Sequence, residues 1–436
     1  MNSSNGNNNS DDNSRNSCGN SSGSNSVGNN SSNSNKKINS NNKVITFGCR
    51  LNACESEIID NFIQELGLDN FTIINTCAVT AEAERKLRQT IRKLHYENNE
   101  IKIILTGCAV ALHADEYMKM DGVVGIISND RKLVKDEYQK YRTDEHLTSS
   151  IDKVRGFLQI QNGCDNKCTY CVVRITRGPN VSFAKEDIVR NARHLLDKGY
   201  KEIVLTGVNI SSYGQDYSNS SELAHLIRHI LKEVPELHRL RLSSLDPADI
   251  NQDLLDIIQN EPRLMPHIHE SIQSGDNMIL KRMLRRHTRE QVIELNQKLI
   301  EIRPEVIIGA DIIAGFPTET DEMFQNTKNF LKEANISLLH AFPYSKRPGT
   351  PAASMPQVQN KIKHQRAKEL RDLAKSILCE KLNSYVGQTF EILAETKTAG
   401  KSNNYLPVKS SGMTPGEVYQ FKCTRVENNV MIGEIL

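Results

Sequence analysis

Short runs of β-branched and apolar residues recur along the chain, and longer stretches with helical periodicity separate them. Three of the first runs end in a cysteine: "KVITFGC" at 43–49, "FTIINTC" at 71–77 and "IKIILTGC" at 101–108. The stretch Glu55–Leu66 between the first two has a helical pattern. Strands that alternate with helices in this way predict an α/β fold with a doubly wound parallel sheet over about 43–145.

The cysteines that follow these strands are Cys49, Cys77 and Cys108. Ligands of open α/β sheets gather at the carboxyl ends of the strands. We therefore expect the three thiols to converge at one edge of the sheet, although they are far apart in the sequence.

Six further strand-like pieces begin at Gly156 and alternate with helical stretches such as Lys185–Lys198 and Glu290–Ile302. They are "GFLQIQNGC", "EIVLTGVN", "RLRLSSLDP", "HIHESIQSG", "VIIGADIIAGFP" and "SLLHAFPYS". Six strand–helix units are too few for a closed eight-fold barrel, so the pattern predicts an open, partial (β/α)6 barrel. The active sites of such barrels lie at the C-terminal ends of the strands, which is where the first strand delivers "GCDNKCTYC".

A charged helix, "KIKHQRAKELRDLAKSILCEKL", precedes a last all-β segment. The pieces "QTFEILAETKTAGKSNNYLPVK", "VYQFKCTRV" and "MIGEIL" alternate around Gly and Asn turns, which predicts a small OB-like barrel. Such barrels commonly bind nucleic acid, and the aromatic residues available for base stacking there are Phe390 and Tyr405.

The beginning of the chain is almost wholly Asn, Ser and Gly, so we expect a disordered tail in which Cys18 is incidental. The pattern therefore divides the chain into four parts. They are the tail at 1–42, an N-terminal domain at 43–150, the partial barrel at 151–378 and the all-β domain at 379–436.

Composition narrows the class of protein. A hydrophobic fraction of 38% over 436 residues supports several folded cores, and a formal net charge of +2 excludes a strongly basic, histone-like protein. There is no run of eighteen apolar residues and no secretory signal pattern, which predicts a cytoplasmic protein without a membrane partner. In that reducing compartment, clustered cysteines are more often metal ligands or catalysts than disulfides.

Cys164, Cys168 and Cys171 form the motif C-x3-C-x2-C. Thiolates at this spacing can hold three irons of a [4Fe–4S] cubane, and the fourth iron stays open because no further cysteine follows before Cys379. An open iron can bind a substrate or cofactor. A zinc site or a chance group of thiols is the alternative, but zinc usually repeats C-x2-C or adds a nearby His.

The motif, with Tyr170 before its last cysteine, resembles the signature of the radical S-adenosylmethionine enzymes. That resemblance implies that the open iron chelates the cofactor and that cluster reduction yields a 5′-deoxyadenosyl radical. The ordered motifs "TFGCRLN", "NTCAVT", "TGCAV", "TRGP", "IQSG", "AGFPTET" and "FPYSKRPGTPAA" resemble the methylthiotransferase family over Lys43–Leu436. The segments "YVGQTFEILAE" and "NNYLPVK" resemble the RNA-binding TRAM domain of that family.

The resemblance implies two [4Fe–4S] clusters, S-adenosylmethionine and an electron donor such as flavodoxin or ferredoxin. The second cluster would be held by Cys49, Cys77 and Cys108, and no separate catalytic base is implied. The implied reaction transfers a methylthio group to C2 of adenosine 37 of tRNA. "GCRLN" and "LTGVNISSYG" are similar to the branch that acts on N6-threonylcarbamoyladenosine, whereas the N6-isopentenyladenosine branch typically has Gln in place of Arg50.

Four residues are candidate contacts of the cofactor. Tyr170 lies within the cysteine motif, Asn209 follows the second barrel strand, Gln273 follows the fourth, and Gly315 lies in the "AGFP" turn. A glycine permits close approach of the backbone to a ligand. The alternative is that these residues only close turns between strands and helices.

Several basic residues are candidate contacts of the substrate. Arg174 and Arg177 follow the cysteine motif and are suited to a phosphate or a carboxylate. The runs "LKRMLRR" and "KIKHQRAKELR" offer positive charge to a tRNA backbone. Arg174 and Arg177 are equally compatible with a solvated loop, and a charge run is more often a solvated face. Cys54, Cys379 and Cys423 are expected to be packing residues or inert thiols.

Some positions depart from the family pattern. Val181 and Phe183 replace arginines, Thr318 replaces Gly, and Glu270 and Ser271 stand at positions that are usually apolar or small. These departures concern contacts with the substrate and not the cluster ligands. Two other functions remain open: a related enzyme that modifies an aspartate of a ribosomal protein, and a non-catalytic RNA-binding protein with a structural metal.

Overall fold

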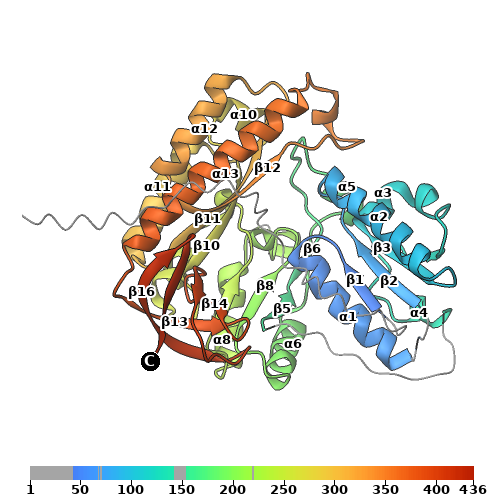
Figure 1. The fold of residues 1–436 in the computed structure, drawn as a ribbon, viewed down its shortest axis with the longest axis horizontal. Helices are drawn as coiled ribbons and strands as arrows, with labels where there is room; N and C mark the ends of the chain where they lie inside the picture. Colours follow the sequence, from blue (N-terminus) through green and yellow to red (C-terminus); the bar gives the residue numbers. More distant parts are fainter. Residues whose placement is uncertain (1–42, 67, 69–70, 142–153, 219) are drawn as a thin grey trace, which may run out of the picture.

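The computed structural model describes residues 43–66, 68, 71–141, 154–218 and 220–436. The predicted tail at 1–42, with Cys18, lies outside the described residues. Figure 1 shows the N-terminal domain in blue to teal, the partial barrel in green to orange and the C-terminal barrel in red. Of the described helices, none has both the length and the apolar character needed to cross a membrane.

The N-terminal domain is built on a four-stranded parallel sheet with the order β1-β2-β3-β4. Its strands are β1 (Lys43–Thr46), β2 (Phe71–Thr76), β3 (Lys102–Gly107) and β4 (Val123–Ile126). The register places Asn75 of β2 beside both Thr46 and Thr106, so the first three strands end at the same level. This agrees with the predicted strands, whereas β4 is a short apolar run that the sequence pattern did not reveal.

Helices cover both faces of this sheet, as predicted. They are α1 (Arg50–Leu66), α2 (Ala81–Glu97), α3 (Cys108–Tyr117) and α4 (Asp136–Gln139). Because side chains alternate along a strand, Ile74 packs with Leu87 of α2 on one face, and Ile73 packs with Ile59 of α1 on the other. Thr80 caps α2 by accepting a hydrogen bond from the amide of Ala83.

Six parallel strands line the central domain in two three-stranded sheets with the orders β5-β8-β9 and β10-β11-β12. They are β5 (Gly156–Gln159), β8 (Ile203–Thr206), β9 (Leu240–Leu242), β10 (His267–Gln273), β11 (Ile307–Ala314) and β12 (Ile336–Pro343). The segment after β9 joins the two sheets, because the amide of Leu245 donates to the carbonyl of His269 and the amide of Ser271 donates to the carbonyl of Leu245, both at 2.8 Å. In the described residues β5 and β12 are the two outer edges of this arrangement. The predicted open barrel is therefore confirmed.

Six longer helices pack on the outside of the partial barrel (Figure 1). They are α6 (Lys185–Asp197), α8 (Leu223–Glu233), α9 (Gln252–Asn260), α11 (Arg289–Ile302), α12 (Asp321–Glu333) and α13 (Asn360–Asn383). Alternate residues of β11, such as Ile308, Ala310 and Ile312, pack toward these helices. Gly309 and Asp311 alternate with these residues along the strand. They therefore face the interior of the barrel, which we call the lumen.

Shorter elements complete this domain and lie mostly at the carboxyl ends of the strands. They are β6 (Gln161–Asn162), α5 (Val173–Arg177), β7 (Val181–Ser182), η1 (Ile210–Ser212), α7 (Gln215–Ser218), η2 (Pro247–Asp249), α10 (Asn277–Met283) and η3 (Pro351–Ser354).

The C-terminal domain is a closed five-stranded barrel with the order β13-β14-β15-β17-β16, as predicted. Its strands are β13 (Thr389–Ala394), β14 (Ala399–Ser402), β15 (Pro407–Lys409), β16 (Val418–Glu427) and β17 (Val430–Ile435). Its core includes Phe390 and Phe421, and Ile307 of β11 packs with them. The small barrel therefore sits against the amino-terminal end of the partial barrel.

Candidate active site

The loop that carries Cys164, Cys168 and Cys171 leaves the carboxyl end of the first barrel strand, as expected. At its start, Gly163 has a φ of +70°, and a Cβ there would lie 1.6 Å from the carbonyl oxygen of Pro179. Only glycine fits this close approach. Further on, the amide of Thr169 donates to Met283 at 3.1 Å, which anchors the loop to α10.

The three thiols of this loop lie close enough to influence one another. Burial, and after it the nearby thiols of Cys168 and Cys164, raises the pKa of Cys171 to about 12. Such a thiol keeps its proton near neutrality unless a metal replaces it. Arg285 reaches the same site, because its Nη1 donates to Cys168 Sγ at 3.5 Å, and it forms an ion pair with Asp246 at 3.0 Å.

The structure also brings the second triad together. Cys49 follows β1, Cys77 follows β2 and Cys108 begins α3. Burial, and after it the nearby thiols of Cys49 and Cys108, raises the pKa of Cys77 to about 12. Gly48, with a φ of +108°, makes room for this thiol, since a Cβ there would lie 2.7 Å from Cys77 Sγ. The expectation that the thiols meet at one sheet edge therefore agrees with the geometry.

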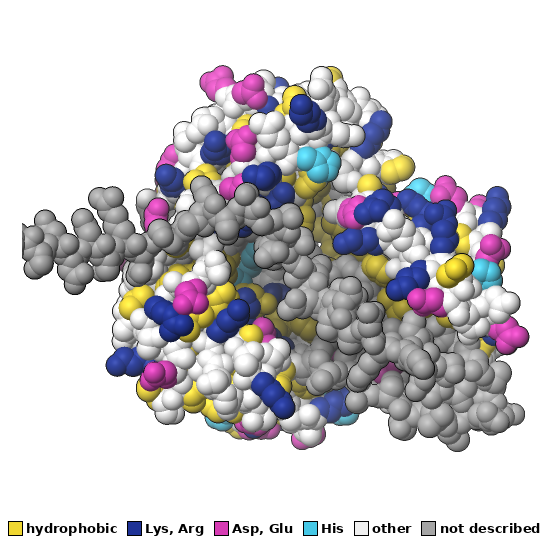
Figure 2. Space-filling view, viewed as in Figure 1, with side chains coloured by type: hydrophobic (Ala, Val, Ile, Leu, Met, Phe, Trp, Pro, Cys, Tyr) yellow, Lys and Arg dark blue, Asp and Glu magenta, His cyan; other side chains and the backbone are white. Residues whose placement is uncertain are grey.

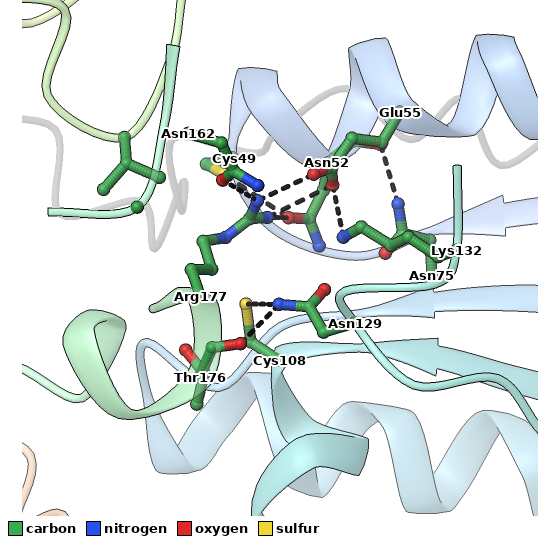
Figure 3. Close-up of polar contacts among 12 residues, drawn as sticks. Cys49, Asn52, Glu55, Asn75, Cys108, Asn129, Lys132, Asn162, Thr176 and Arg177 are labelled. Atoms are coloured by element: carbon green, nitrogen blue, oxygen red, sulfur yellow. Dashed lines mark hydrogen bonds and ion pairs between the residues drawn. The ribbon is translucent and has the colours of Figure 1, made fainter. Parts of the chain in front are cut away.

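A polar network surrounds this second triad (Figure 3). Arg177 donates to both carboxylate oxygens of Glu55, at 2.7 and 3.1 Å, and to Asn52 Oδ1 at 2.7 Å. Asn52 Oδ1 also accepts from Cys49 Sγ at 3.6 Å. Lys132 forms a second buried ion pair with Glu55 at 2.5 Å. Burial would raise the pKa of Glu55, but Lys132 and Arg177 hold it below its usual value.

The short helix α5 connects the two triads. It begins two residues after Cys171, and its end contacts the N-terminal domain through Thr176, whose carbonyl accepts from Asn129 Nδ2 at 2.6 Å, and through Arg177. Asn129 Nδ2 also lies 3.9 Å from Cys108 Sγ (Figure 3). A helix of five residues is only about 7 Å long. The two triads are therefore close neighbours across one turn of helix.

Cysteine thiols are the donors in both triads. Thiolates are the protein ligands of [4Fe–4S] clusters, and three of them leave one iron open. The donors of each triad are therefore chemically suited to such a cluster. Among the described residues, a separate group of donor atoms, from His269, Asp311 and His340 in the lumen, lies within 4.8 Å of one another.

The four candidate cofactor contacts all lie near the carboxyl ends of the barrel strands. Tyr170 packs beside Phe316, Asn209 directly precedes η1, and Gly315 follows β11 with a φ of +69°. Gln273 ends β10 with a φ of +78°, a conformation that costs a residue other than glycine about 1–3 kcal/mol. Their contact with the cofactor stays a prediction.

Gln161 is a supporting residue that the sequence pattern did not reveal. Its Oε1 accepts from the amides of Val208 and Asn209, both at 3.0 Å. Its Nε2 donates to the carbonyl of Gly163 and to Asn180, both at 2.6 Å. It thus ties the cysteine loop to the turn after β8. An isolated Gln in a strand gives no signal of this role.

The candidate basic residues divide into two kinds. Arg177 is buried in the network described above, whereas Arg174 is exposed. Within "LKRMLRR", Arg285 and Arg286 form ion pairs with Asp246. Within "KIKHQRAKELR", Arg366 is buried in ion pairs with acidic residues. The charges of Arg177, Arg285 and Arg366 are therefore satisfied inside the protein, whereas other cations of the two runs, such as Lys281, Lys361 and Lys368, are exposed.

The residues that depart from the family motifs lie in different environments in the structure. Glu270 pairs with Ala310, so it points toward the helices and not into the lumen, and it is fully buried. Phe183 packs against the barrel core, while Val181 is exposed. Thr318 has a φ of +70°, which is unfavourable for a β-branched residue and explains why glycine suits this position.

The Radical SAM superfamily model matches residues 158–331, and the model of the Uncharacterized protein family UPF0004 matches residues 41–128. The threonylcarbamoyladenosine tRNA methylthiotransferase MtaB of Rickettsia prowazekii is 46% identical over 408 residues, covering 90% of this chain and 97% of that protein. The chain belongs to the radical SAM methylthiotransferase family. It is an enzyme of that class, and the non-catalytic alternative is set aside.

Other relatives of this methylthiotransferase carry two different names. MtaB of Thermotoga maritima is 35% identical, with 81% of this chain and 86% of that protein covered. The tRNA-2-methylthio-N(6)-dimethylallyladenosine synthase of Protochlamydia amoebophila is 37% identical, with 81% and 85% covered. Among solved structures, the radical S-adenosylmethionine methyltransferase TsrM from Kitasatospora setae has a TM-score of 0.53 at 12% identity, covering 72% of this chain and 76% of that chain. That likeness concerns the fold alone.

Proposed function

We propose that this methylthiotransferase transfers a methylthio group to C2 of N6-threonylcarbamoyladenosine at position 37 of tRNA, with S-adenosylmethionine and two [4Fe–4S] clusters. The observation that carries the proposal is the junction at α5, which makes the two cysteine triads neighbours. The choice of adenosine derivative is supported by the 46% identity to the protein named MtaB.

Each triad has a distinct proposed role. Cys164, Cys168 and Cys171 would hold the cluster that binds S-adenosylmethionine, and Cys49, Cys77 and Cys108 would hold the second cluster. When bound, these groups supply the radical and the sulfur chemistry that an inert aromatic C–H bond requires. The thiols in both triads must lose their protons to act as ligands.

Neighbouring side chains stabilise and orient the cysteines of both triads. Arg285 places a cation 3.5 Å from Cys168 Sγ, where it offsets the negative charge of a thiolate. On the other side, Asn52 accepts from Cys49, and Arg177 holds Asn52 in place. Because Glu55 and Arg177 are buried, their ion pair also excludes water from the back of the second triad.

Binding of tRNA is proposed for two surfaces. The C-terminal barrel is one, by its likeness to RNA-binding barrels. The outer face of α2 is the other, because Arg85, Lys86, Arg92 and Lys93 are all exposed on it, and Figure 2 shows Lys and Arg side chains gathered over this part of the molecule. A flavodoxin or ferredoxin donor and a cytoplasmic location remain predictions.

Mass spectrometry of digested tRNA from cells with and without the enzyme tests this function. We expect 2-methylthio-N6-threonylcarbamoyladenosine to disappear when the gene is deleted. In vitro, Cys77→Ala should abolish this product while 5′-deoxyadenosine is still formed. Cys423→Ala, which changes a buried cysteine outside both triads, is the control. A normal yield of product from Cys77→Ala would remove the second triad from the mechanism.

The second candidate substrate is the apolar N6-isopentenyl or dimethylallyl derivative of adenosine 37. The 37% identity to the dimethylallyladenosine synthase of Protochlamydia amoebophila favours keeping it. Anticodon stem-loop RNAs that carry either modification, offered separately to the reconstituted enzyme, distinguish the two substrates. If neither RNA is methylthiolated, a ribosomal-protein aspartate becomes the substrate to test.

A further inference from the structure

A group of basic side chains surrounds the ring of Tyr405, which lies between β14 and β15 of the C-terminal barrel. His267 stacks on this ring with centroids 4.8 Å apart. Four cations lie within 5.5 Å of the ring centre, namely Arg50, Arg155, Arg241 and Lys401. Tyr405 is therefore not free to stack on an RNA base, and Phe390 is buried in the core of the C-terminal barrel.

The arginines at the bottom of the lumen are matched by carboxylates. Glu202, which is fully buried, pairs with Arg155 at 2.7 Å, with Arg239 at 2.8 Å and with Arg241 at 2.7 Å. Two further carboxylates come from the C-terminal barrel, since Glu395 pairs with Arg155 at 2.5 Å and Glu391 pairs with Arg239. Three arginines thus meet three carboxylates.

Arg50 and Lys401 differ from these arginines. Within the part of the chain that the structure describes, neither forms an ion pair with a carboxylate, and the hydrogen-bond partner of Arg50 is the hydroxyl of Tyr405, at 3.1 Å from Nη2. The group therefore carries two positive charges in excess. A partly buried cation without a counter-charge is unfavourable, so this place is suited to an anion that comes from outside the chain.

Two further observations agree with an anion site. Nη1 of Arg241 and Nη2 of Arg155 are buried without a hydrogen-bond partner in the described structure, so donors remain unused beside the ring. Burial would raise the pKa of Tyr405, but Arg50, Arg155 and Lys401 lower it, which indicates a positive potential at its hydroxyl.

Arg50 connects this positively charged group of side chains with the second cysteine triad. Arg50 directly follows Cys49 and is the first residue of α1. Its guanidinium nevertheless reaches Tyr405 of the C-terminal barrel. A group bound to Arg50 is therefore within the length of one arginine side chain of the backbone next to Cys49, and the target base must lie near this triad if the proposed function is correct.

We propose that Arg50, Lys401 and the hydroxyl of Tyr405 bind the carboxylate on the N6 substituent of the target adenosine, and so select the threonylcarbamoyl group over apolar substituents. This inference rests on the proposed function. The threonyl group carries a free carboxylate, and the planar guanidinium of arginine matches a carboxylate in geometry. An isopentenyl group would leave both cations partly buried and unpaired, and a site built for hydrogen bonds rejects such analogues strongly.

Binding of matched anticodon stem-loop RNAs to the reconstituted holoenzyme tests the proposal. One RNA carries N6-threonylcarbamoyladenosine at position 37, and a second carries the same group with its carboxylate converted to a carboxamide. We expect the wild type to bind the first roughly 10–100-fold more tightly, as one or two charge-assisted hydrogen bonds allow. In Arg50→Gln, this preference should fall to about one, with partial rescue in Arg50→Lys.

An RNA phosphate is the other possible source of the anion, and the design separates it from the carboxylate. If Arg50 contacts a phosphate, Arg50→Gln weakens the binding of both RNAs equally and the preference of the wild type survives, which would overturn the proposal. Lys298→Gln, at an exposed lysine of α11, is the control and should keep the preference of the wild type.

Folding and function are checked separately. Iron and sulfide content and circular dichroism report whether Arg50→Gln folds. Tyr405→Phe, which removes only the hydroxyl, is the milder variant and should reduce the preference by a smaller factor. If the wild type methylthiolates only the isopentenyl RNA, the proposed function is wrong. If it methylthiolates the threonylcarbamoyl RNA while Arg50→Gln and Tyr405→Phe keep its full preference, this inference alone is wrong.

Discussion

Replacement of Glu270 by leucine is expected to remove a loss of stability that the wild-type protein suffers as the pH rises. Glu270 lies on β10 and is fully buried on the helix-facing side of the sheet. Burial raises the pKa of this carboxyl from 4.5 to about 8, and Asn296 offsets the shift only in part. Leucine fits the apolar surroundings and has no charge to desolvate.

The sign of the pH dependence follows from the raised pKa. Between pH 4.5 and about 8, the unfolded chain loses the proton of Glu270 and the folded chain keeps it. The free energy of unfolding therefore falls as the pH rises through this window and levels off above it. The slope approaches about 1.4 kcal/mol per pH unit, and the whole effect is on the order of 5 kcal/mol.

Thermal unfolding of wild type, Glu270→Leu and Glu270→Gln between pH 5 and pH 8.5 measures this effect. For a domain of about 200 residues, 1 kcal/mol shifts the unfolding midpoint by about 2–4 °C. The wild-type midpoint should thus fall by about 8–15 °C more than that of either variant, since the effect between these pH values is roughly 4 kcal/mol. Glu301→Gln, at an exposed acid of α11, should follow the wild type. Equal slopes in wild type and Glu270→Leu would refute the assignment of a protonated Glu270.

Three other substitutions test the frame of the active site. Gly163→Ala should reduce the iron content of the radical SAM site to a small fraction of that of the wild type, because its Cβ would lie 1.6 Å from the Pro179 oxygen; normal iron content would contradict this. Arg177→Met should destabilise the N-terminal domain by about 1–3 kcal/mol in denaturant unfolding, since Glu55 and Asn52 lose hydrogen bonds while Lys132 still pairs with Glu55, and a double-mutant cycle with Glu55→Gln should show coupling. Glu202→Gln should cost about 3–5 kcal/mol, because three buried arginines lose their shared carboxylate, and an unchanged unfolding midpoint would disprove the role given to that carboxylate.

Much of the architecture was predictable because local patterns determine it. The β-branched runs that end in Cys49, Cys77 and Cys108 are strands of one parallel sheet, so the common level of their ends follows from the fold class. The six strand–helix units required an open barrel, which the structure has. The strand β4 was not predictable, because a run of four residues that includes a glycine has no clear period.

The supporting residues of the site could not be predicted from local patterns. Asn52 and Glu55 lie three residues apart on α1, a spacing that usually marks a solvated helix face. They are buried because Lys132 of the N-terminal domain covers Glu55 and because Arg177 of the partial barrel meets both residues where the two domains dock. A sequence does not encode this docking in any single element. The same reason hides the partner of Arg50, since Tyr405 lies 355 positions further along the chain.

The C-terminal barrel consequently combines two roles: it completes the packing at the lumen, and it is a proposed surface for tRNA. Its loop carries Tyr405 into the lumen, the carbonyl of Asn403 accepts from Arg241 at 3.0 Å, and Asn404 donates to the carbonyl of Glu305 at 3.3 Å. Removal of this domain would therefore uncover a fully buried arginine as well as any RNA-binding surface. Because the same loop borders the proposed carboxylate site, a module that holds tRNA would also form one wall of the site that reads its modified base. Point substitutions at this loop are for that reason more informative about recognition than deletion of the domain.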